Sequence, residues 1–370
     1  MQESWLDRAP SHSDELPTRC DVLVVGGGLA GIGCALELAR GGASVVLCEA
    51  SDRLGGGSIG RDPGLVQVGT SEHTHRLRAA LGDTRCADYL AVSRRSSALL
   101  SEHVAVREGL VRLGLGAEVD ELEAAVEAAV ELGLQSRLEE TVAGPARSVE
   151  GDGLVDPVEL VEVLAAKARE AGARLVTRAR VRHIAPGPRA RVDWRELSCE
   201  MVIYTAGYQT QGLDRWFDDK LYPVRLQTLA FEGELPLEGA SAQHGYLTWR
   251  RTPWGVLAGG ARWATPHMEL GETDPVCSAM VGARISAMTA RTFPSVSNEI
   301  LAAQARIECF TCDNLPLVGA LPGQPRKLVC TGFGEHALSL APGCAEGLAR
   351  SILTGEAALP ELLCPGRMVL

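Results

Sequence analysis

The residues best suited to chemistry lie near the start of the chain, where three glycines form the pattern G-x-G-x-x-G at Gly26, Gly28 and Gly31. The first glycine permits a tight turn, the second lets the backbone approach a pyrophosphate, and the third lets a helix pack close to a strand. In dinucleotide-binding proteins an acid about 20 residues further on binds a ribose hydroxyl. Glu49 stands at this place, so the four residues together predict a dinucleotide-binding site.

A strand–turn–helix–strand unit must position these residues. Asp21–Val25 is a short, continuous apolar run, typical of a parallel strand that is buried on both faces. We expect a helix over Leu29–Arg40, whose N-terminal amides face the anion, and a second strand over Ala43–Leu47 that ends just before the acid. The run Cys20–Ala39 has the length of a membrane span, but its two acids and its glycines favour the soluble unit.

The composition bounds the class of protein. The chain has 370 residues, of which 46% are hydrophobic and 22% charged, as in a globular protein with two sizeable domains. A net charge of -11 argues against nucleic acid as a partner. The eleven cysteines are scattered and read as free thiols of a reducing compartment. The segment Met1–Cys20 lacks the apolar core of an export signal, which predicts a cytoplasmic protein.

Further segments point to a particular family. A second glycine cluster with an arginine, Gly57–Val66 ("GSIGRDPGLV"), follows the acid, and a simple nicotinamide enzyme has no evident need for it. Three more stretches follow in order: Met201–Thr210, Thr311–Gly323 with T-x-D-x-x-P-x-x-G, and Cys330–Gly355 with a "GFGEH" turn. The chain resembles the D-amino-acid oxidase-type superfamily of FAD-dependent oxidoreductases, most closely the glycine oxidase, sarcosine oxidase and gamma-glutamylputrescine oxidase branch.

This resemblance implies an α/β fold. We expect a discontinuous Rossmann-like FAD-binding domain and an α+β substrate domain that is built on an antiparallel sheet. Strand-like runs between Tyr222 and Trp263 fit that sheet, and Glu118–Gly133 is expected to be an amphipathic helix with Leu122, Val126 and Val130 inside and solvated glutamates outside. The expected boundaries are 18–80, 146–210 and 306–370 for the FAD-binding domain, 81–145 and 211–305 for the substrate domain, and 1–17 for an N-terminal extension.

The cofactor implied by the resemblance is FAD, and we expect it to be bound non-covalently because the cysteines near the expected site, Cys309 and Cys312, do not match the spacing of covalently linked relatives. The positions expected to bind FAD are Gly26, Gly28, Leu29, Ala30, Gly31, Glu49, Ala50, Arg53, Gly57, Ser58, Arg61, Gly64, Val181, Ala206, Gly207, Gly332, Gly334, His336, Ala337 and Leu338.

The implied reaction moves a hydride from a carbon next to nitrogen to flavin N5, so the protein needs to position its substrate more than to provide acid–base chemistry. Tyr246 resembles a tyrosine that contacts the substrate carboxylate in glycine oxidase, although a tyrosine packed in a sheet is an equal alternative. Arg250 and Arg262 could pair with a carboxylate, or lie at the surface. His336 occupies the histidine place of the G-F-x-G-H turn, but Glu335 stands where the family usually has glycine.

Two short motifs raise the question of a metal. His73 and His75 form H-x-H, and Cys309 and Cys312 form C-x-x-C. H-x-H on one strand needs a third ligand, and C-x-x-C without a second pair is a weak signal. We therefore predict no metal site.

The pattern also departs from the family. The tryptophan-glycine-arginine loop that precedes T-x-D in amino-acid oxidising members looks deleted, because Arg306 is followed almost directly by Thr311. No lysine lies on the strand Gly255–Trp263, whereas relatives that activate oxygen have a lysine above the flavin. The electron acceptor is therefore left open between oxygen and another acceptor.

These observations favour dehydrogenation of a C–N bond in an amine, imino acid or amino-acid-derived metabolite. We expect a small-molecule substrate, no nucleic acid, no membrane span, and a homo- or hetero-oligomer. The alternatives are a non-catalytic flavin-fold subunit of a hetero-oligomeric dehydrogenase, which the deleted loop and Glu335 also fit, and a flavin monooxygenase.

Overall fold

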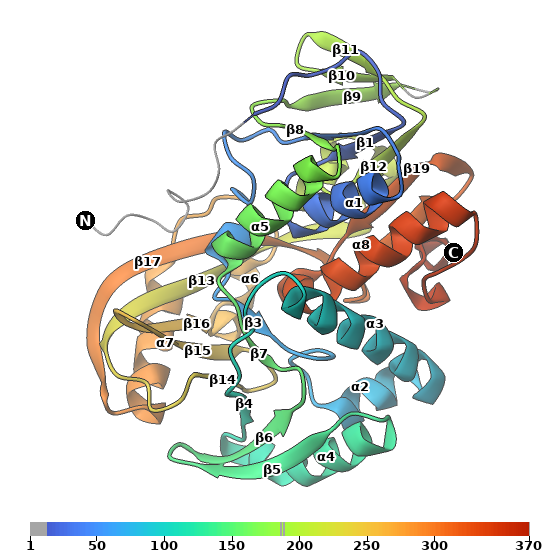
Figure 1. The fold of residues 1–370 in the computed structure, drawn as a ribbon. Helices are drawn as coiled ribbons and strands as arrows, with labels where there is room; N and C mark the ends of the chain where they lie inside the picture. The colour runs from blue at the N-terminus through green and yellow to red at the C-terminus, as the bar shows by residue number, and fades with distance from the viewer. Residues whose placement is uncertain (1–12, 186, 188, 370) are drawn as a thin grey trace.

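The chain folds around two large sheets (Figure 1). The structure, a computed structural model, describes residues 13–185, 187 and 189–369, so residues 1–12 of the expected N-terminal extension lie outside the described residues. Within these ranges the first sheet has six strands in the order β18-β19-β12-β1-β2-β8. Neighbouring strands run parallel except for β18 and β19. The bounds are β1 (Val22–Val25), β2 (Val45–Cys48), β8 (Arg174–Val176), β12 (Met201–Tyr204), β18 (Leu317–Leu321) and β19 (Gln324–Thr331).

Both faces of this six-stranded sheet are covered. Val22 and Val24 of β1 pack in one apolar core with helices α1 (Leu29–Arg40), α5 (Pro157–Glu170) and α8 (Ala337–Thr354). The alternate residues of β1, Leu23 and Val25, pack in a second core against a small antiparallel sheet. A strand with two buried faces requires the continuous apolar run seen in the sequence. The small sheet consists of β9 (Val181–Ala185), β10 (Arg189–Val192) and β11 (Arg195–Ser198).

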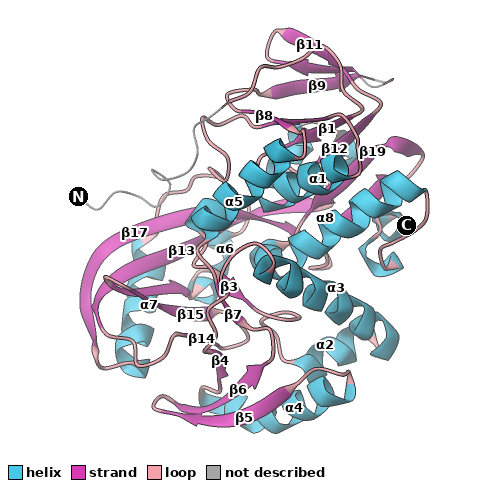
Figure 2. Ribbon diagram, viewed as in Figure 1, coloured by secondary structure: helices cyan, strands magenta, loops and turns pink. Residues whose placement is uncertain are grey.

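The second large sheet has eight strands within the described ranges, in the order β17-β13-β16-β15-β14-β4-β6-β5 (Figure 2). It is antiparallel except where β14 runs parallel to β4. Helix α7 (Ala279–Thr292) packs on it, and the indole Nε1 of buried Trp249 donates to Thr289 Oγ1 at 3.0 Å. The strands are β4 (Leu110–Leu113), β5 (Ser136–Thr141), β6 (Gly144–Val149), β13 (Leu221–Gly233), β14 (Gly239–Ala242), β15 (Leu247–Thr252), β16 (Gly255–Gly260) and β17 (Val296–Thr311).

The remaining elements are a short strand pair and further helices. Strands β3 (Leu65–Val66) and β7 (Gly153–Leu154) form an antiparallel pair between the two sheets. The other helices are α2 (Thr74–Leu81), α3 (Asp83–Ser101), α4 (Leu122–Glu131) and α6 (Pro266–Glu269). No helix in the part of the chain that the structure describes combines the length and the apolarity needed to cross a bilayer.

The expected fold class is confirmed, and several local expectations hold in detail. Helix α1 spans Leu29–Arg40 as expected. Helix α5 begins after Asp156, whose carboxylate accepts the main-chain N–H groups of Val158 and Glu159 at 2.9 and 3.2 Å. Such a cap, followed by Pro157 at the first helical position, is the start signal that the sequence carries.

Two local expectations are wrong. His73 and His75 do not lie on a strand, because His73 caps α2 and His75 lies in its first turn. The expected helix over 118–133 begins only at Leu122, and the preceding 3-10 turn buries Glu118 to 6% exposure instead of leaving it solvated. Val130 is 54% exposed, because the alanines of α4 face the core in its place.

Candidate functional site

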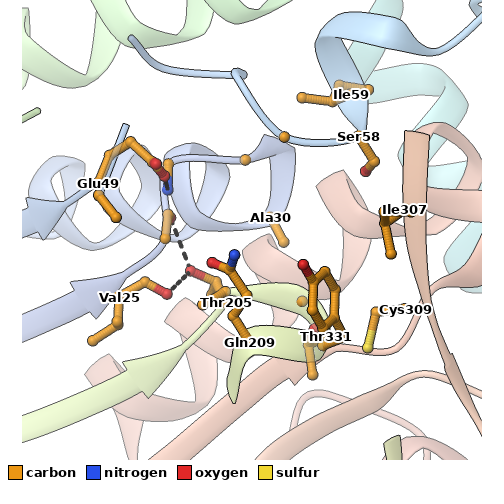
Figure 3. Close-up of a pocket in the computed structure, with 18 of the residues that line it drawn as sticks. Val25, Ala30, Glu49, Ser58, Ile59, Thr205, Gln209, Ile307, Cys309 and Thr331 are labelled. Atoms are coloured by element: carbon orange, nitrogen blue, oxygen red, sulfur yellow. Dashed lines mark hydrogen bonds between the residues drawn. The ribbon is translucent and has the colours of Figure 1, made fainter. Parts of the chain in front are cut away.

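A cavity of about 570 Å³ opens where β1, β2 and β12 end (Figure 3). Ligands of open parallel sheets bind outside the carboxyl ends of the strands, in this kind of crevice. Its walls come from the turn after β1, the loop after β2, the turn after β12, the C-terminal half of β17, and the start of α8. These segments are distant in the sequence, and the six-stranded sheet brings them together.

The three motif glycines serve two different purposes in this structure. A Cβ atom on Gly31 would lie 2.0 Å from the carbonyl oxygen of Gly26, and one on Gly26, whose φ is +115°, would lie 2.7 Å from Thr205 O. These two glycines are needed for packing of the protein on itself. Gly28 lines the cavity, and a Cβ there would meet no protein atom within 4 Å. The space beside Gly28 is therefore open for a ligand.

The carboxylate of Glu49 is fixed at the end of β2. Its Oε2 accepts the N–H of Gly27 at 2.7 Å, and its Oε1 accepts the N–H of Ser51 at 2.7 Å. An ionised carboxylate has about four acceptor positions, so each oxygen keeps capacity for a ligand hydroxyl. Together with the open space at Gly28, this arrangement fits the adenosine half of a dinucleotide.

Buried charges line the opposite wall. Arg306 Nε donates to Glu308 Oε1 at 3.0 Å, and Arg306 Nη2 lies 3.7 Å from Asp62 Oδ2. Burial raises the pKa of Glu308 to about 7, against the opposing effect of Arg306, and burial also raises the pKa of Asp62. Arg306 is thus held between two buried acids.

Aromatic rings and an arginine gather near the "GFGEH" turn. Arg262 lies over the ring of Tyr246 with its Cζ 4.6 Å from the centroid, and over Phe310 at 5.3 Å. Its Nε lies 3.2 Å from Glu335 Oε1. The ring of Trp263 meets Tyr246 edge-on at 5.9 Å. Tyr246 and Arg262 are thus in contact with each other, but they do not line the cavity that holds the glycine motif.

Arg250 lies against main-chain oxygen atoms in this structure. Its Nη1 donates to the carbonyl oxygens of Pro63 and Val155 at 2.6 and 2.7 Å. The side chain therefore joins β15 to the segments beside β3 and β7 through one of its nitrogen atoms.

Burial is the main cause that lowers the pKa of His336, and the charges of Arg112 and Arg262 act in the same direction against Glu335. The low pKa favours the neutral form of the His336 imidazole. It ends the 3-10 turn Gly334–His336 and does not line the cavity, although Gly334 does.

Most of the positions expected to bind the cofactor come together on this cavity. Those that line it are Gly26, Gly28, Leu29, Ala30, Glu49, Ala50, Gly57, Ser58, Arg61, Val181, Ala206, Gly207, Gly332, Gly334 and Ala337.

The other expected positions lie elsewhere for physical reasons. Gly31 packs against Gly26, and a Cβ on Gly64 would lie 2.2 Å from Val155 O. Leu338 is buried in the apolar core under α8. Arg53 lies outside the cavity with its Nε 3.3 Å from Asp52 Oδ1.

Sequence reasoning missed several wall residues. Thr205 Oγ1 donates to the main-chain oxygens of Val25 and Gly26 at 2.9 and 3.0 Å and so holds the floor of the cavity. Glu308 was also missed. Its signal was the alternation of Arg306 and Glu308 on a strand that is otherwise apolar at this end.

Comparison with known proteins gives a consistent result. A family model described as "FAD dependent oxidoreductase" (DAO) matches residues 21–351. The structure of L-proline dehydrogenase from P. horikoshii is similar, with a TM-score of 0.81 and 19% identity over 95% of this chain and 98% of that one. Glycine oxidase from Geobacillus kaustophilus gives a TM-score of 0.78 and 20% identity over 96% and 100% of the two chains. Iminodiacetate oxidase from Chelativorans sp. BNC1 gives 0.75 and 18% over 93% and 98%. No curated protein matches the sequence significantly.

Proposed function

Because this chain belongs to the family of FAD-dependent oxidoreductases, we propose that it dehydrogenates a C–N bond of an amine, imino acid or amino-acid-derived metabolite. FAD bound in the cavity would supply the two-electron acceptor for this chemistry. The observation that carries the proposal is the open space beside Gly28. A side chain at this position would fill that space, and no contact within the protein requires a glycine there.

The chain's own residues supply binding and orientation. We propose that the amides at the start of α1 and the carboxylate of Glu49 hold the adenosine and pyrophosphate half of FAD. Arg61, whose Nη1 donates to the carbonyl oxygens of Gly56 and Gly57 at 2.7 and 2.9 Å, would fix the loop along the other half.

The start of α8 supports the same proposal. Gly334 and Ala337 line the cavity at the N-terminal end of this helix. The positive end of the helix dipole there favours negative charge, which a reduced flavin carries. A Cβ on Gly334, whose φ is +53°, would lie 2.7 Å from Phe310, so this turn also needs glycine.

The charges near the cavity bear on the substrate class. The names of the three similar structures give an amino or imino acid as substrate, and their fold alone does not transfer that substrate to this chain. In this chain Arg262 lies against Glu335, and Arg306 lies against Glu308 and Asp62. Because both arginines already face acids, we propose a cationic amine whose carboxylate, if it has one, lies away from the reacting carbon.

We also propose the division into domains that the sequence predicts. The six-stranded sheet with its helices would form the FAD-binding domain, and the eight-stranded sheet would form the substrate domain. Tyr246 and Arg262 would then belong to the substrate side, and positioning of the amine is the role that we propose for them.

The test is the absorbance of the purified protein in the flavin bands, followed anaerobically during addition of amines, imino acids and amino acids. We expect yellow protein that bleaches with an amine class, and readmitted air then shows whether oxygen is the acceptor. A yellow protein that none of these compounds bleaches supports the non-catalytic subunit instead. A colourless protein that takes up no FAD overturns the proposal. Gly28→Ala is the matched variant that should weaken FAD binding, because its Cβ would enter the open space without meeting a protein atom within 4 Å.

A further inference from the structure

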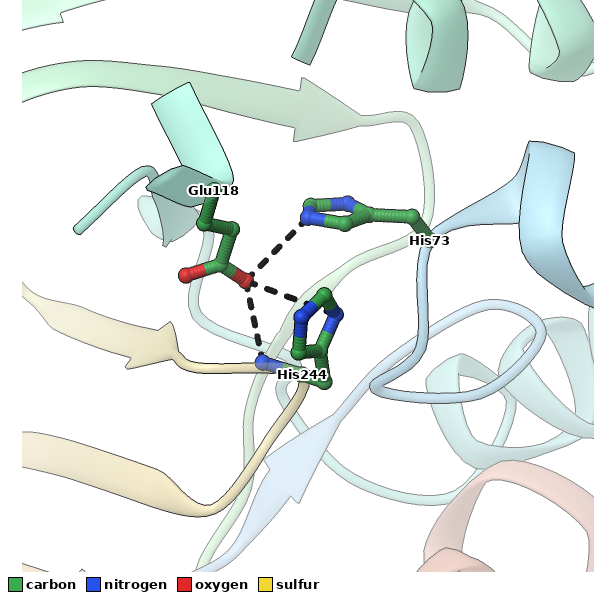
Figure 4. Close-up of side chains that lie close together, drawn as sticks. All are labelled: His73, Glu118 and His244. Carbon is green, nitrogen blue, oxygen red and sulfur yellow. Dashed lines mark hydrogen bonds and ion pairs between the residues drawn. The ribbon is translucent and has the colours of Figure 1, made fainter. Parts of the chain in front are cut away.

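Two histidines and a glutamate converge at a place apart from the FAD cavity (Figure 4). His73 precedes α2, Glu118 lies in the 3-10 turn Gly116–Glu121, and His244 lies in the turn between β14 and β15. One ligand atom from each lies within 4.8 Å of the others. None of the three residues lines the FAD cavity.

The spacing of these atoms suits one small cation. His73 Nε2 lies 3.1 Å and His244 Nδ1 lies 3.9 Å from the same oxygen, Glu118 Oε1. Tetrahedral zinc with metal–ligand distances of roughly 2.0–2.1 Å places its ligand atoms about 3.4 Å apart. The two observed separations lie on either side of this value, so small side-chain movements would place an ion between the three groups.

Both ring nitrogens of His73 and the Nδ1 of His244 are buried without a hydrogen bond to the described residues. His73 is 1% exposed, and neither of its ring nitrogens makes a hydrogen bond there. Its Nε2 lies at ion-pair distance, 3.1 Å, from Glu118 Oε1, and its Nδ1 has no partner among the described residues. His244 Nδ1 likewise lies 2.8 Å from Glu72 Oε1 without forming a hydrogen bond. Buried polar atoms normally have partners, and a metal ion would provide one.

The glutamate is held in place for such a role. Glu118 Oε2 accepts the N–H of Gln243 at 2.7 Å, and Oε1 accepts the N–H of His244 at 2.9 Å. Gln243 and His244 have φ values of 52° and 56°, in the left-handed region, so the carboxylate stabilises a turn that aims His244 inward. Hydrogen bonds that orient a ligand are typical of metal sites.

We propose that His73, Glu118 and His244 bind one divalent transition-metal ion of the zinc type. Imidazole nitrogen and carboxylate oxygen are ligands that Zn²⁺ accepts, and three protein ligands leave a fourth position for water or a small anion. The ion would join the start of α2 to the turn between β14 and β15 at the eight-stranded sheet. This site does not depend on the reaction proposed above.

The experiment uses the FAD-containing protein after dialysis against EDTA, titrated with Zn²⁺ in competition with a coloured chelator. We expect one equivalent of Zn²⁺ per chain. His244→Gln and Glu118→Gln should each weaken binding by more than the roughly 100-fold upper range for changes outside the ligand shell. His267→Gln, at an exposed position on α6, is the matched control and should leave the affinity unchanged.

Co²⁺ gives a second readout, because tetrahedral coordination by nitrogen and oxygen produces visible absorption bands that His244→Gln should remove. Zn²⁺ should also raise the Tm of the unchanged protein and not that of His244→Gln, because ligands that bind only the folded state stabilise it. Equal FAD content in both proteins shows that the variant folds. Failure to bind one saturating equivalent, or binding that His244→Gln leaves intact, overturns the proposal.

Discussion

The two walls of the FAD cavity are built in opposite ways. The wall at Gly26–Glu49 consists of main-chain atoms and one carboxylate from a single short segment, and two of its glycines are required by contacts within the protein. The wall at Arg306 and Glu308 consists of charged side chains that meet Asp62 from a distant loop. The stability of the first wall therefore depends on close packing, whereas the stability of the second depends on charge balance and on pH.

The largest loss of stability is expected where the close packing around the motif glycines is disrupted. Gly31→Val should cost more than about 3 kcal/mol, because overpacking against fixed backbone is poorly relieved, and its Cβ would lie 2.0 Å from Gly26 O. Urea unfolding of the FAD-free protein measures the loss. Gly28→Ala is the control and should keep the stability of the FAD-free protein while weakening FAD binding. Equal destabilisation by both variants would contradict the division between packing and ligand glycines.

The charged wall is tested next by Arg306→Met. The change leaves Glu308 and Asp62 buried without their cation, and removal of one partner from a buried pair costs about 3–5 kcal/mol. Since both carboxyl groups can take up protons in acid, the loss should be larger at pH 8 than at pH 5. A loss that does not change with pH would show that Arg306 acts only through packing.

A smaller effect with a defined direction is expected for Glu308→Gln. The pKa of Glu308 is raised from 4.5 to about 7, chiefly by burial. The folded state therefore holds a proton that the unfolded state releases, and this contribution is full below pH 4.5 and is lost as the pH rises through 7. Relative to Glu308→Gln, the unchanged protein should lose about 3 kcal/mol of unfolding free energy across this interval. Urea midpoints at a series of pH values give the comparison, and an opposite slope would refute it.

The smallest effect is expected for Arg250→Met, outside both walls. Loss of its bonds to the carbonyl oxygens of Pro63 and Val155 should reduce stability by about 2 kcal/mol. The KM for any substrate found by flavin bleaching should stay unchanged. A large rise of KM with unchanged stability would show that Arg250 binds the substrate. It would also weaken the contrast between the two regions.

The same contrast explains what the sequence could predict. The strand, the helix over Leu29–Arg40 and the position of Glu49 follow from local patterns, because backbone turns and helix caps are set by neighbouring residues. The burial of Glu118 and the contacts of Arg250 depend on segments far away in the chain. In the sequence His73 is paired with His75 by their H-x-H spacing. The fold instead brings His73 close to His244, and no local spacing in the sequence indicates this contact.

Strand β17 combines an exposed half and a buried half in one element. It lies at the edge of the eight-stranded sheet, and its burial changes from largely exposed near 298–303 to buried near Cys309 and Thr311. The outer half can therefore accept new side chains at little cost, although its backbone stays paired with β13, while the inner half stays fixed beside the cofactor. For protein engineering, the outer half of β17 is a place to attach a tether or a reporter that follows the state of the flavin without altering it.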